Sequence, residues 1–202
     1  DALREDMSVM FLAGVSTRTL SLISERLIGR KISAAEVSKA SNQLSEAVET
    51  WRERDLSKEP IKYIFVDGTI FSMRVEGSVE KVPVLLAIGV TTEGRRTVLG
   101  LQAGDKESAS SWRELFKDLK RRGLDGSMVT LGIMDGLSGL ERVFMGEFPN
   151  AKVQRCQVHV CRNVLAKVPR KLKQTIADEV RSIFYASSRK KAIGFFKQFK
   201  AK

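Results

Sequence analysis

The strongest constraint on the fold is an apolar and aromatic run with a carboxylate inside it, YIFVDGTIFSMRV at residues 63–75. Such a run predicts a buried β-strand, and the first expected strand is Ile61–Val66. Asp67 lies within the run, and burying a carboxylate is costly unless a partner pairs with it or coordinates it. The sequence therefore predicts that a cation meets Asp67.

A second carboxylate follows a second apolar strand. In LGIMDGLSGL, Asp135 comes at the C-terminal end of the expected strand Met128–Met134. If the two strands are neighbours, Asp67 and Asp135 face each other across about 5 Å, and carboxylates that close repel unless a cation lies between them. Oxygen ligands favour Mg²⁺ or Mn²⁺, and a pair of such ions commonly serves phosphoryl transfer. The alternative is that both aspartates are strand-end turn residues, because Asp-Gly is a frequent turn dipeptide.

The middle of the chain predicts one mixed sheet in the order β-β-β-α-β-α-β. Its first and fourth strands can lie side by side at the centre, joined by crossover helices. The expected strands are Ile61–Val66, Val82–Val90, Thr97–Ala103, Met128–Met134 and Ala151–Gln154. Two helices are expected. The first carries Trp112, Leu115, Phe116 and Leu119 on one face, and the second spans Leu137–Phe148. The fold class is therefore α/β.

Residues 1–59 read as helical. Ser16 can cap a helix that ends before Gly29, and Ser33–Glu36 fits a capping box that opens a longer helix towards Trp51. Two helices joined by a short glycine-containing turn suggest a helix-turn-helix, although a plain helical hairpin fits equally well. The face that the second helix would offer to a DNA groove carries Lys39, Asn42 and Gln43. The polar stretch Trp51–Pro60 is the expected linker.

The charge of the chain is unevenly distributed. Residues 151–202 carry 14 basic and 2 acidic side chains, whereas residues 1–59 carry 9 and 10 and residues 60–150 carry 12 of each. A basic block of this kind favours a polyanion, with nucleic acid the first candidate, and a solvated helical face is the plainer alternative. The basic residues expected to contact DNA phosphates include Lys167, Arg170, Lys171 and Lys173.

The segment RCQVHVCRN suggests zinc at first sight. Cys156, His159 and Cys161 would supply three of four ligands, but no fourth ligand is evident. Helical spacing puts Cys161 on an apolar face, whereas His159 and Arg162 fall on the opposite face, with Arg155 and Cys156 near them. We expect no zinc site.

These blocks together resemble the Mutator-type bacterial insertion-sequence transposases, which have a ribonuclease H-like DDE catalytic core. The resemblance rests on VDGTIFSMR, LLAIGVTTEGRRTVLGL, GDKESASSWRELFKDLKRRGL, MDGLSGL and FPNAKVQRCQVHVCRNVLAKVP, in the order of the family and over about two thirds of the chain. The stretch GVSTRTLSLISERLIGRKISAAEVSKAS also resembles the helix-turn-helix of the family.

The resemblance implies a DNA transposase that cleaves strands and transfers them with two Mg²⁺ or Mn²⁺ ions. Asp67 and Asp135 would be the first two acids of its triad, and Cys156 with His159 would match the family's Cys-x-x-His signature. This pair would have a structural role or would help to position DNA near the metals, and Arg155, His159 and Arg162 are expected to contact DNA. The third acid, a glutamate, should follow a helical insertion, and none of Glu141, Glu147 and Glu179 has the required context. We therefore expect a catalytically incomplete fragment that lacks the third acid.

The expected organisation has three parts: a helical DNA-binding region at 1–59, an incomplete catalytic core at 60–156 and a truncated basic helical insertion at 157–202. The expected partners are terminal inverted repeats, target DNA and a second copy of the protein or a larger assembly. No apolar run approaches the roughly 18 residues that span a membrane, so a cytoplasmic, nucleoid-associated bacterial protein is expected. Two other functions remain open: a non-catalytic, DNA-binding transposase that acts as an inhibitor, and another ribonuclease H-like nuclease.

Overall fold

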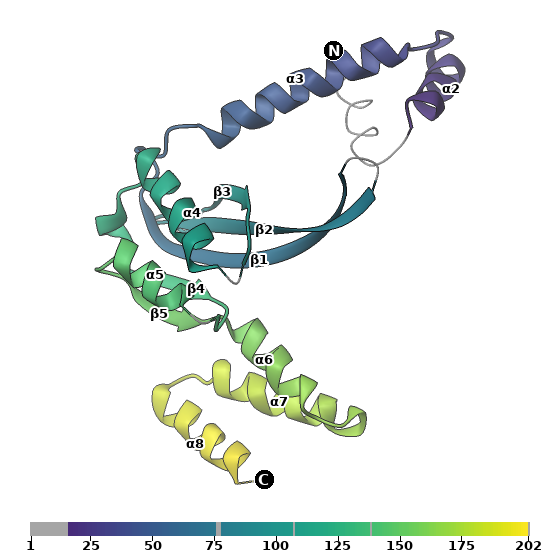
Figure 1. Cartoon of the computed structure of the whole chain (residues 1–202). Coiled ribbons are helices and arrows are strands. Elements are labelled where there is room, and N and C mark those ends of the chain that lie inside the picture. The colour runs from purple at the N-terminus through teal and green to yellow at the C-terminus, as the bar shows by residue number, and fades with distance from the viewer. Residues whose placement is uncertain (1–15, 76–77, 107, 138, 202) are drawn as a thin grey trace. The chain divides into compact units, whose positions relative to one another are not determined.

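The computed structural model describes residues 16–75, 78–106, 108–137 and 139–201 (Figure 1). The chain divides into two units, Asp1–Arg54 and Asp55–Lys202, and each is described by itself. The first unit contains helices α2 (Thr17–Ile28) and α3 (Ala34–Arg52). The second unit contains a sheet and the remaining helices.

Local capping fixes the ends of α2 and α3, as the sequence predicts. The Ser16 hydroxyl accepts the backbone N–H of Thr19, and Gly29 ends α2 with φ of 69°, a left-handed conformation that glycine adopts without steric cost. At the start of α3, Ser33 and Glu36 form a reciprocal capping box. Both predicted helices and both predicted caps are confirmed.

The second unit is built on a five-stranded mixed sheet. Its strands are β1 (Ile61–Val75), β2 (Ser78–Thr91), β3 (Arg96–Ala103), β4 (Leu131–Met134) and β5 (Lys152–Arg155). The spatial order is β3-β2-β1-β4-β5. The β1–β2 and β2–β3 pairs are antiparallel, whereas β1–β4 and β4–β5 are parallel. The predicted α/β sheet, with its first and fourth strands adjacent, is confirmed.

Three strand boundaries differ by more than one residue from the sequence-based expectation. β2 begins at Ser78 and not at Val82, because its first residues pair with the end of β1. β1 continues past Val66 to Val75, because β2 pairs with it along almost its whole length. β4 begins only at Leu131, because Gly126–Met128 forms a 3₁₀ turn, labelled η1, in which Asp125 accepts the N–H of Ser127. Pairing between β1 and β2 therefore decided two of these boundaries, and a local turn decided the start of β4.

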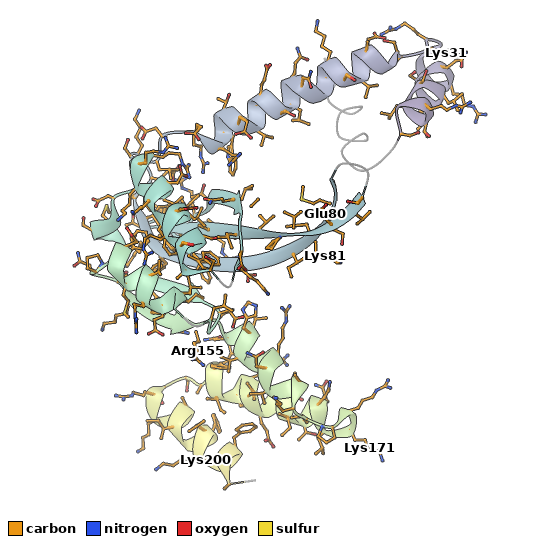
Figure 2. All side chains as sticks on the ribbon, viewed as in Figure 1. Lys31, Glu80, Lys81, Arg155, Lys171 and Lys200 are labelled. Atoms are coloured by element: carbon orange, nitrogen blue, oxygen red, sulfur yellow. The ribbon has the colours of Figure 1, made fainter. Side chains whose placement is uncertain are left out.

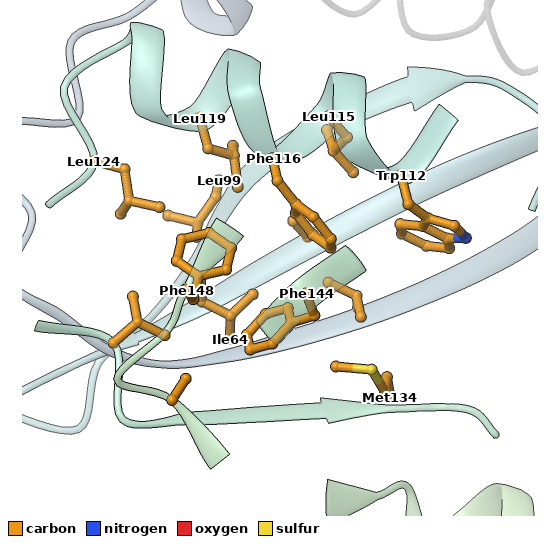
Figure 3. Close-up of a cluster of buried hydrophobic side chains, with 14 of the residues drawn as sticks. Ile64, Leu99, Trp112, Leu115, Phe116, Leu119, Leu124, Met134, Phe144 and Phe148 are labelled. Atoms are coloured by element: carbon orange, nitrogen blue, oxygen red, sulfur yellow. The ribbon is translucent and has the colours of Figure 1, made fainter. Parts of the chain in front are cut away.

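Helices α4 (Ala109–Arg121) and α5 (Leu140–Glu147) cover one face of the sheet. Their buried side chains form an aromatic cluster with Phe148, shown in Figure 3. The ring of Phe116 meets the rings of Phe144 and Phe148 edge-on, with centroids 5.5 Å and 5.6 Å apart. Edge-to-face rings of this kind stabilise a core beyond the effect of their burial alone. The sheet residues beneath them include Ile64, Val66, Leu85 and Met134.

Helical structure follows β5. The elements are α6 (Gln157–Ala166), η2 (Arg170–Leu172), α7 (Lys173–Phe184) and α8 (Arg189–Lys200). The basic helical tail that the sequence predicts is therefore confirmed as helix. In the part of the chain that the structure describes, no helix is long and apolar enough to cross a membrane.

Replacement of Gly132 tests the fit between β4 and α5. A Cβ at Gly132 would overlap the ring of buried Phe144, so Gly132→Ala is expected to lower the free energy of unfolding by about 1–3 kcal/mol. Gly146→Ala on α5 is the control, because a Cβ there meets nothing within 4 Å and alanine favours helix. Chemical denaturation of both variants measures the difference, and equal stabilities would contradict the packing described.

The capping box predicts a pH-dependent difference between wild type and Glu36→Gln. Hydrogen bonds from Ser33, followed by those from Arg30, lower the pKa of Glu36 from 4.5 to about 2. Since the folded-state pKa is depressed, the ionised carboxylate stabilises α3 above pH 4.5, and this stabilisation disappears as the pH falls towards 2. Amide hydrogen exchange in the first turn of α3 should therefore be slower in wild type near neutrality and converge with Glu36→Gln near pH 2. A difference that persists at the lowest pH would contradict this assignment.

Candidate active site

Strand pairing brings the two aspartates to the same end of the sheet. β1 and β4 run parallel with Tyr63 opposite Leu131 and Phe65 opposite Ile133. Asp67 and Asp135 each lie two residues beyond that last pair. Neighbouring strands are about 4.8 Å apart, so the pairing brings Asp67, which lies within β1, towards Asp135, which directly follows the C-terminal end of β4.

The alternation of β1 decides which face Asp67 occupies. Ile64 and Val66 are buried under the helices, so Phe65 and Asp67 project from the opposite face. The Asp67 side chain is 52% exposed. The prediction of a buried carboxylate at Asp67 is therefore wrong, because this position of an otherwise apolar strand faces water. Exposure removes the desolvation cost and leaves the carboxylate accessible to a ligand.

Asp135 is half-buried and lies directly after β4. Its Oδ1 accepts the backbone N–H of Gly136 at 2.7 Å, a contact of the kind that the turn interpretation expects. The guanidinium of Arg155 lies over Gly136: a Cβ placed on that glycine would be 3.0 Å from Arg155 Cζ. Asp135 is thus held at the strand end with a basic group one residue away.

The Cys-x-x-His segment comes to the same edge. The backbone N–H of Cys156 donates to the carbonyl of Met134 at 2.7 Å, which fixes the start of α6 against the end of β4. His159 follows in the first turn of α6, and its Nε2 lies 3.8 Å from Asp67 Oδ1. Both cysteines are free thiols with intermediate burial. The structure therefore brings Cys156 and His159 beside Asp67.

A hollow of about 280 Å³ lies beside Asp67 on the open face of the sheet. Its walls are mostly apolar and include Phe65, Leu86 and Ile88, while Asp67, His159 and Arg96 supply polar groups. The sequence analysis did not identify Phe65 or Arg96 as site residues. Alternation within each strand could have put Phe65 on the same face as Asp67, but no local signal brings Arg96 of β3 to this hollow.

Two carboxylates on neighbouring strands, Asp67 within β1 and Asp135 directly after β4, fit a hard divalent cation. Mg²⁺ is commonly held by one or two carboxylates together with waters and substrate phosphates, so a pair of aspartates is a sufficient protein contribution. Among the described residues, no three His, Cys, Asp or Glu side chains converge closely enough to hold an ion. The glutamates considered for the third acid, Glu141, Glu147 and Glu179, accordingly do not join the aspartates, and Glu147 instead pairs with Lys120.

The predicted DNA-binding side chains are surface groups. In the second unit, Figure 2 shows Arg155 at the end of β5 and Lys171 on the helical segment that follows. The exposed basic residues of this unit that were predicted to bind DNA are Arg155, Arg162, Lys167, Arg170, Lys171 and Lys173. In the first unit, Lys39, Asn42 and Gln43 share an exposed face of α3, opposite the buried Val37 and Ala40.

Comparison with known sequences identifies relatives over most of the chain. A family model described as "Transposase, Mutator family" matches residues 1–202. The transposase for insertion sequence element IS406 of Burkholderia multivorans is 37% identical over 189 residues, which is 92% of this chain and 48% of that protein. The transposase for IS256 in transposon Tn4001 of Staphylococcus aureus is 36% identical over 183 residues, 91% of this chain and 46% of that protein.

The chain spans about half the length of these curated relatives. Among solved structures, a chain from the simian T-cell lymphotropic virus intasome in complex with the PP2A regulatory subunit B56 gamma aligns with a TM-score of 0.33 and 11% identity. The alignment covers 90% of this chain and 69% of that one. A likeness at this level carries no argument about fold or function.

Proposed function

Because this chain belongs to the Mutator family of transposases, we propose that its sheet is a ribonuclease H-like core that supplies two acids of a DNA strand-transfer site. The observation that carries the proposal is the parallel register of β1 and β4, which leads Asp67 and Asp135 to one edge. The strand order β3-β2-β1-β4-β5, with three antiparallel strands followed by two parallel ones, supports the same core. The activity proposed belongs to the whole transposase.

In this proposal Asp67 and Asp135 hold two divalent ions, Mg²⁺ or Mn²⁺. When bound, the ions would activate a water or a 3′-hydroxyl and stabilise the leaving oxygen of the DNA phosphodiester. The protein contributes position: backbone pairing with β2 and β4 fixes Asp67, and the Gly136 N–H orients Asp135. Because Asp67 is 52% exposed on an open face, a DNA phosphate can approach it directly.

The basic helices supply the electrostatic part of DNA binding. Residues 151–202 carry 14 basic and 2 acidic side chains, and the structure makes most of this segment helix. The helices follow β5 directly in the chain, so they can hold the DNA backbone close to the aspartates. α3 of the first unit offers Lys39, Asn42 and Gln43 for contacts with the terminal repeats. We further propose that the protein acts as a dimer or a larger assembly on paired ends.

Carboxylate replacement tests the metal role. Asp67→Asn and Asp135→Asn should each weaken Mg²⁺ and Mn²⁺ binding to this chain about tenfold or more, because a direct ligand is lost. Isothermal titration with each metal measures the change. Asp178→Asn is the matched control, since Asp178 is an exposed carboxylate on α7 that bonds to Gln174. In a full-length transposase the same two variants should abolish transposition but retain DNA binding, and full transposition by Asp67→Asn would refute the assignment.

Charge removal tests the DNA-binding helices. Each phosphate contact contributes about 0.9 to the slope of log affinity against log salt concentration. A quadruple glutamine variant of the predicted contacts should therefore reduce that slope by about 3–4 on duplex DNA. The residues replaced are Lys167, Arg170, Lys171 and Lys173.

A control variant with the same change of charge separates these contacts from net charge. It replaces four exposed basic residues outside residues 151–202, namely Lys58, Arg113, Lys117 and Arg142. Fluorescence anisotropy at several salt concentrations gives both slopes. An equal loss of slope in the two variants would show that the tail has no special part in binding.

A further inference from the structure

The separation between His159 and Asp67 has a specific chemical meaning. The distance of 3.8 Å from Nε2 to Oδ1 is too long for a hydrogen bond, which requires about 2.7–3.2 Å. Divalent metals such as zinc bind imidazole nitrogen and carboxylate oxygen at about 2.0–2.2 Å. Two ligands of one ion are then about 3 Å apart when they are at right angles and about 4 Å apart when they are opposite. The observed separation lies within that range.

The fold holds His159 at this position through contacts at both ends of the segment. The Cys156 N–H donates to Met134 of β4, and the Val160 N–H donates to the Cys156 carbonyl at 3.0 Å as α6 begins. Asp67 is fixed independently by its place in β1, opposite Leu86 of β2. The two donor atoms therefore come from elements that are far apart in sequence but tied to the same sheet.

The orientation of the imidazole leaves one nitrogen for a ligand. Nδ1 is buried and has no hydrogen-bond partner among the described residues. Nε2 instead faces the Asp67 carboxylate, and the His159 side chain is 23% exposed. Both side chains line the hollow beside β1, so an ion can reach them from solvent.

We propose that Asp67 Oδ1 and His159 Nε2 jointly bind one divalent transition-metal cation. The inference rests on the proposed function, because it takes Asp67 as a metal-binding carboxylate. It adds the imidazole nitrogen of His159 as a second ligand of the ion that Asp67 holds, and this ligand does not require the third acid. A nitrogen donor alters selectivity: Mg²⁺ takes oxygen ligands, whereas imidazole suits transition metals, whose affinities rise from Mn²⁺ to Co²⁺. Mn²⁺ is thus preferred over Mg²⁺ at this position, and Co²⁺ is the sharper probe.

A simple ion pair is the rival explanation of the same contact. A protonated His159 would attract Asp67 and compete with any cation for the carboxylate. The two explanations predict opposite changes in metal affinity when the ring nitrogens are removed. Loss of a ligand weakens transition-metal binding and changes Mg²⁺ binding little, whereas loss of a competitor strengthens the binding of both metals.

The experiment uses the fact that this chain contains a single histidine. The 202-residue chain, labelled with ¹⁵N in histidine, is titrated with Co²⁺ and observed by NMR. Ligation through Nε2 gives a large contact shift of that one imidazole nitrogen. In parallel, calorimetry compares Co²⁺, Mn²⁺ and Mg²⁺ binding to wild type, His159→Phe, His159→Gln and the α6 surface control Asn163→Ala.

The expected result is a contact shift in wild type and a Co²⁺ affinity about tenfold or more lower in His159→Phe, with Mg²⁺ affinity changed much less. An unshifted imidazole at saturating Co²⁺, or tighter binding of both metals by His159→Phe, would overturn the proposal. The NMR result is obtained with the wild-type chain and so does not depend on how a variant folds. Asp67→Asn separates the two levels: if it loses metal binding while His159→Phe does not, the proposed function stands and this inference fails.

Discussion

The parallel pairing of β1 with β4 is the constraint on which the rest of this molecule depends. Tyr63 opposite Leu131 and Phe65 opposite Ile133 set the register, and that register leads Asp67 and Asp135 to the same edge. Packing supports the pairing, because α5 places Phe144 against Gly132 with no room for a side chain between them. A shift of one residue would turn each apolar side chain to the wrong face, so the core and the candidate site are specified together.

The two faces of the sheet have different tasks because strand side chains alternate. Ile64 and Val66 enter a core closed by α4 and α5, while Phe65 and Asp67 face outward beside His159. A carboxylate on the outer face keeps its hydration until a ligand replaces it. Burial of one face therefore makes the β1 backbone rigid, while the other face presents an accessible carboxylate. A metal ligand must be both held in place and accessible to the ion.

The sequence predicted features that depend on contacts within a few residues, but it predicted less well those that depend on contacts between distant residues. Ser16, Gly29 and Ser33 set helix ends through contacts within three or four residues, so their patterns predicted α2 and α3. The end of β1 depends on pairing with β2. The apolar run extends to residue 75, but the expected strand ended at Val66. For the site, residue types suggested a cation at the aspartates, but the exposure of Asp67 was missed, because composition says a strand is apolar and not which positions face water.

The sequence by itself determined the kinds of element, their order, the presence of an aspartate in or after each of two apolar strands, and the basic character of residues 151–202. These follow from periodicity, capping and charge, which act over a few residues. Only the tertiary structure decided that Asp67 is 52% exposed and that His159 lies 3.8 Å from it. Those facts depend on which strands pair and where α6 starts against β4. These contacts join residues up to 68 positions apart, as in the pair of Tyr63 with Leu131, and they have no counterpart in any local pattern.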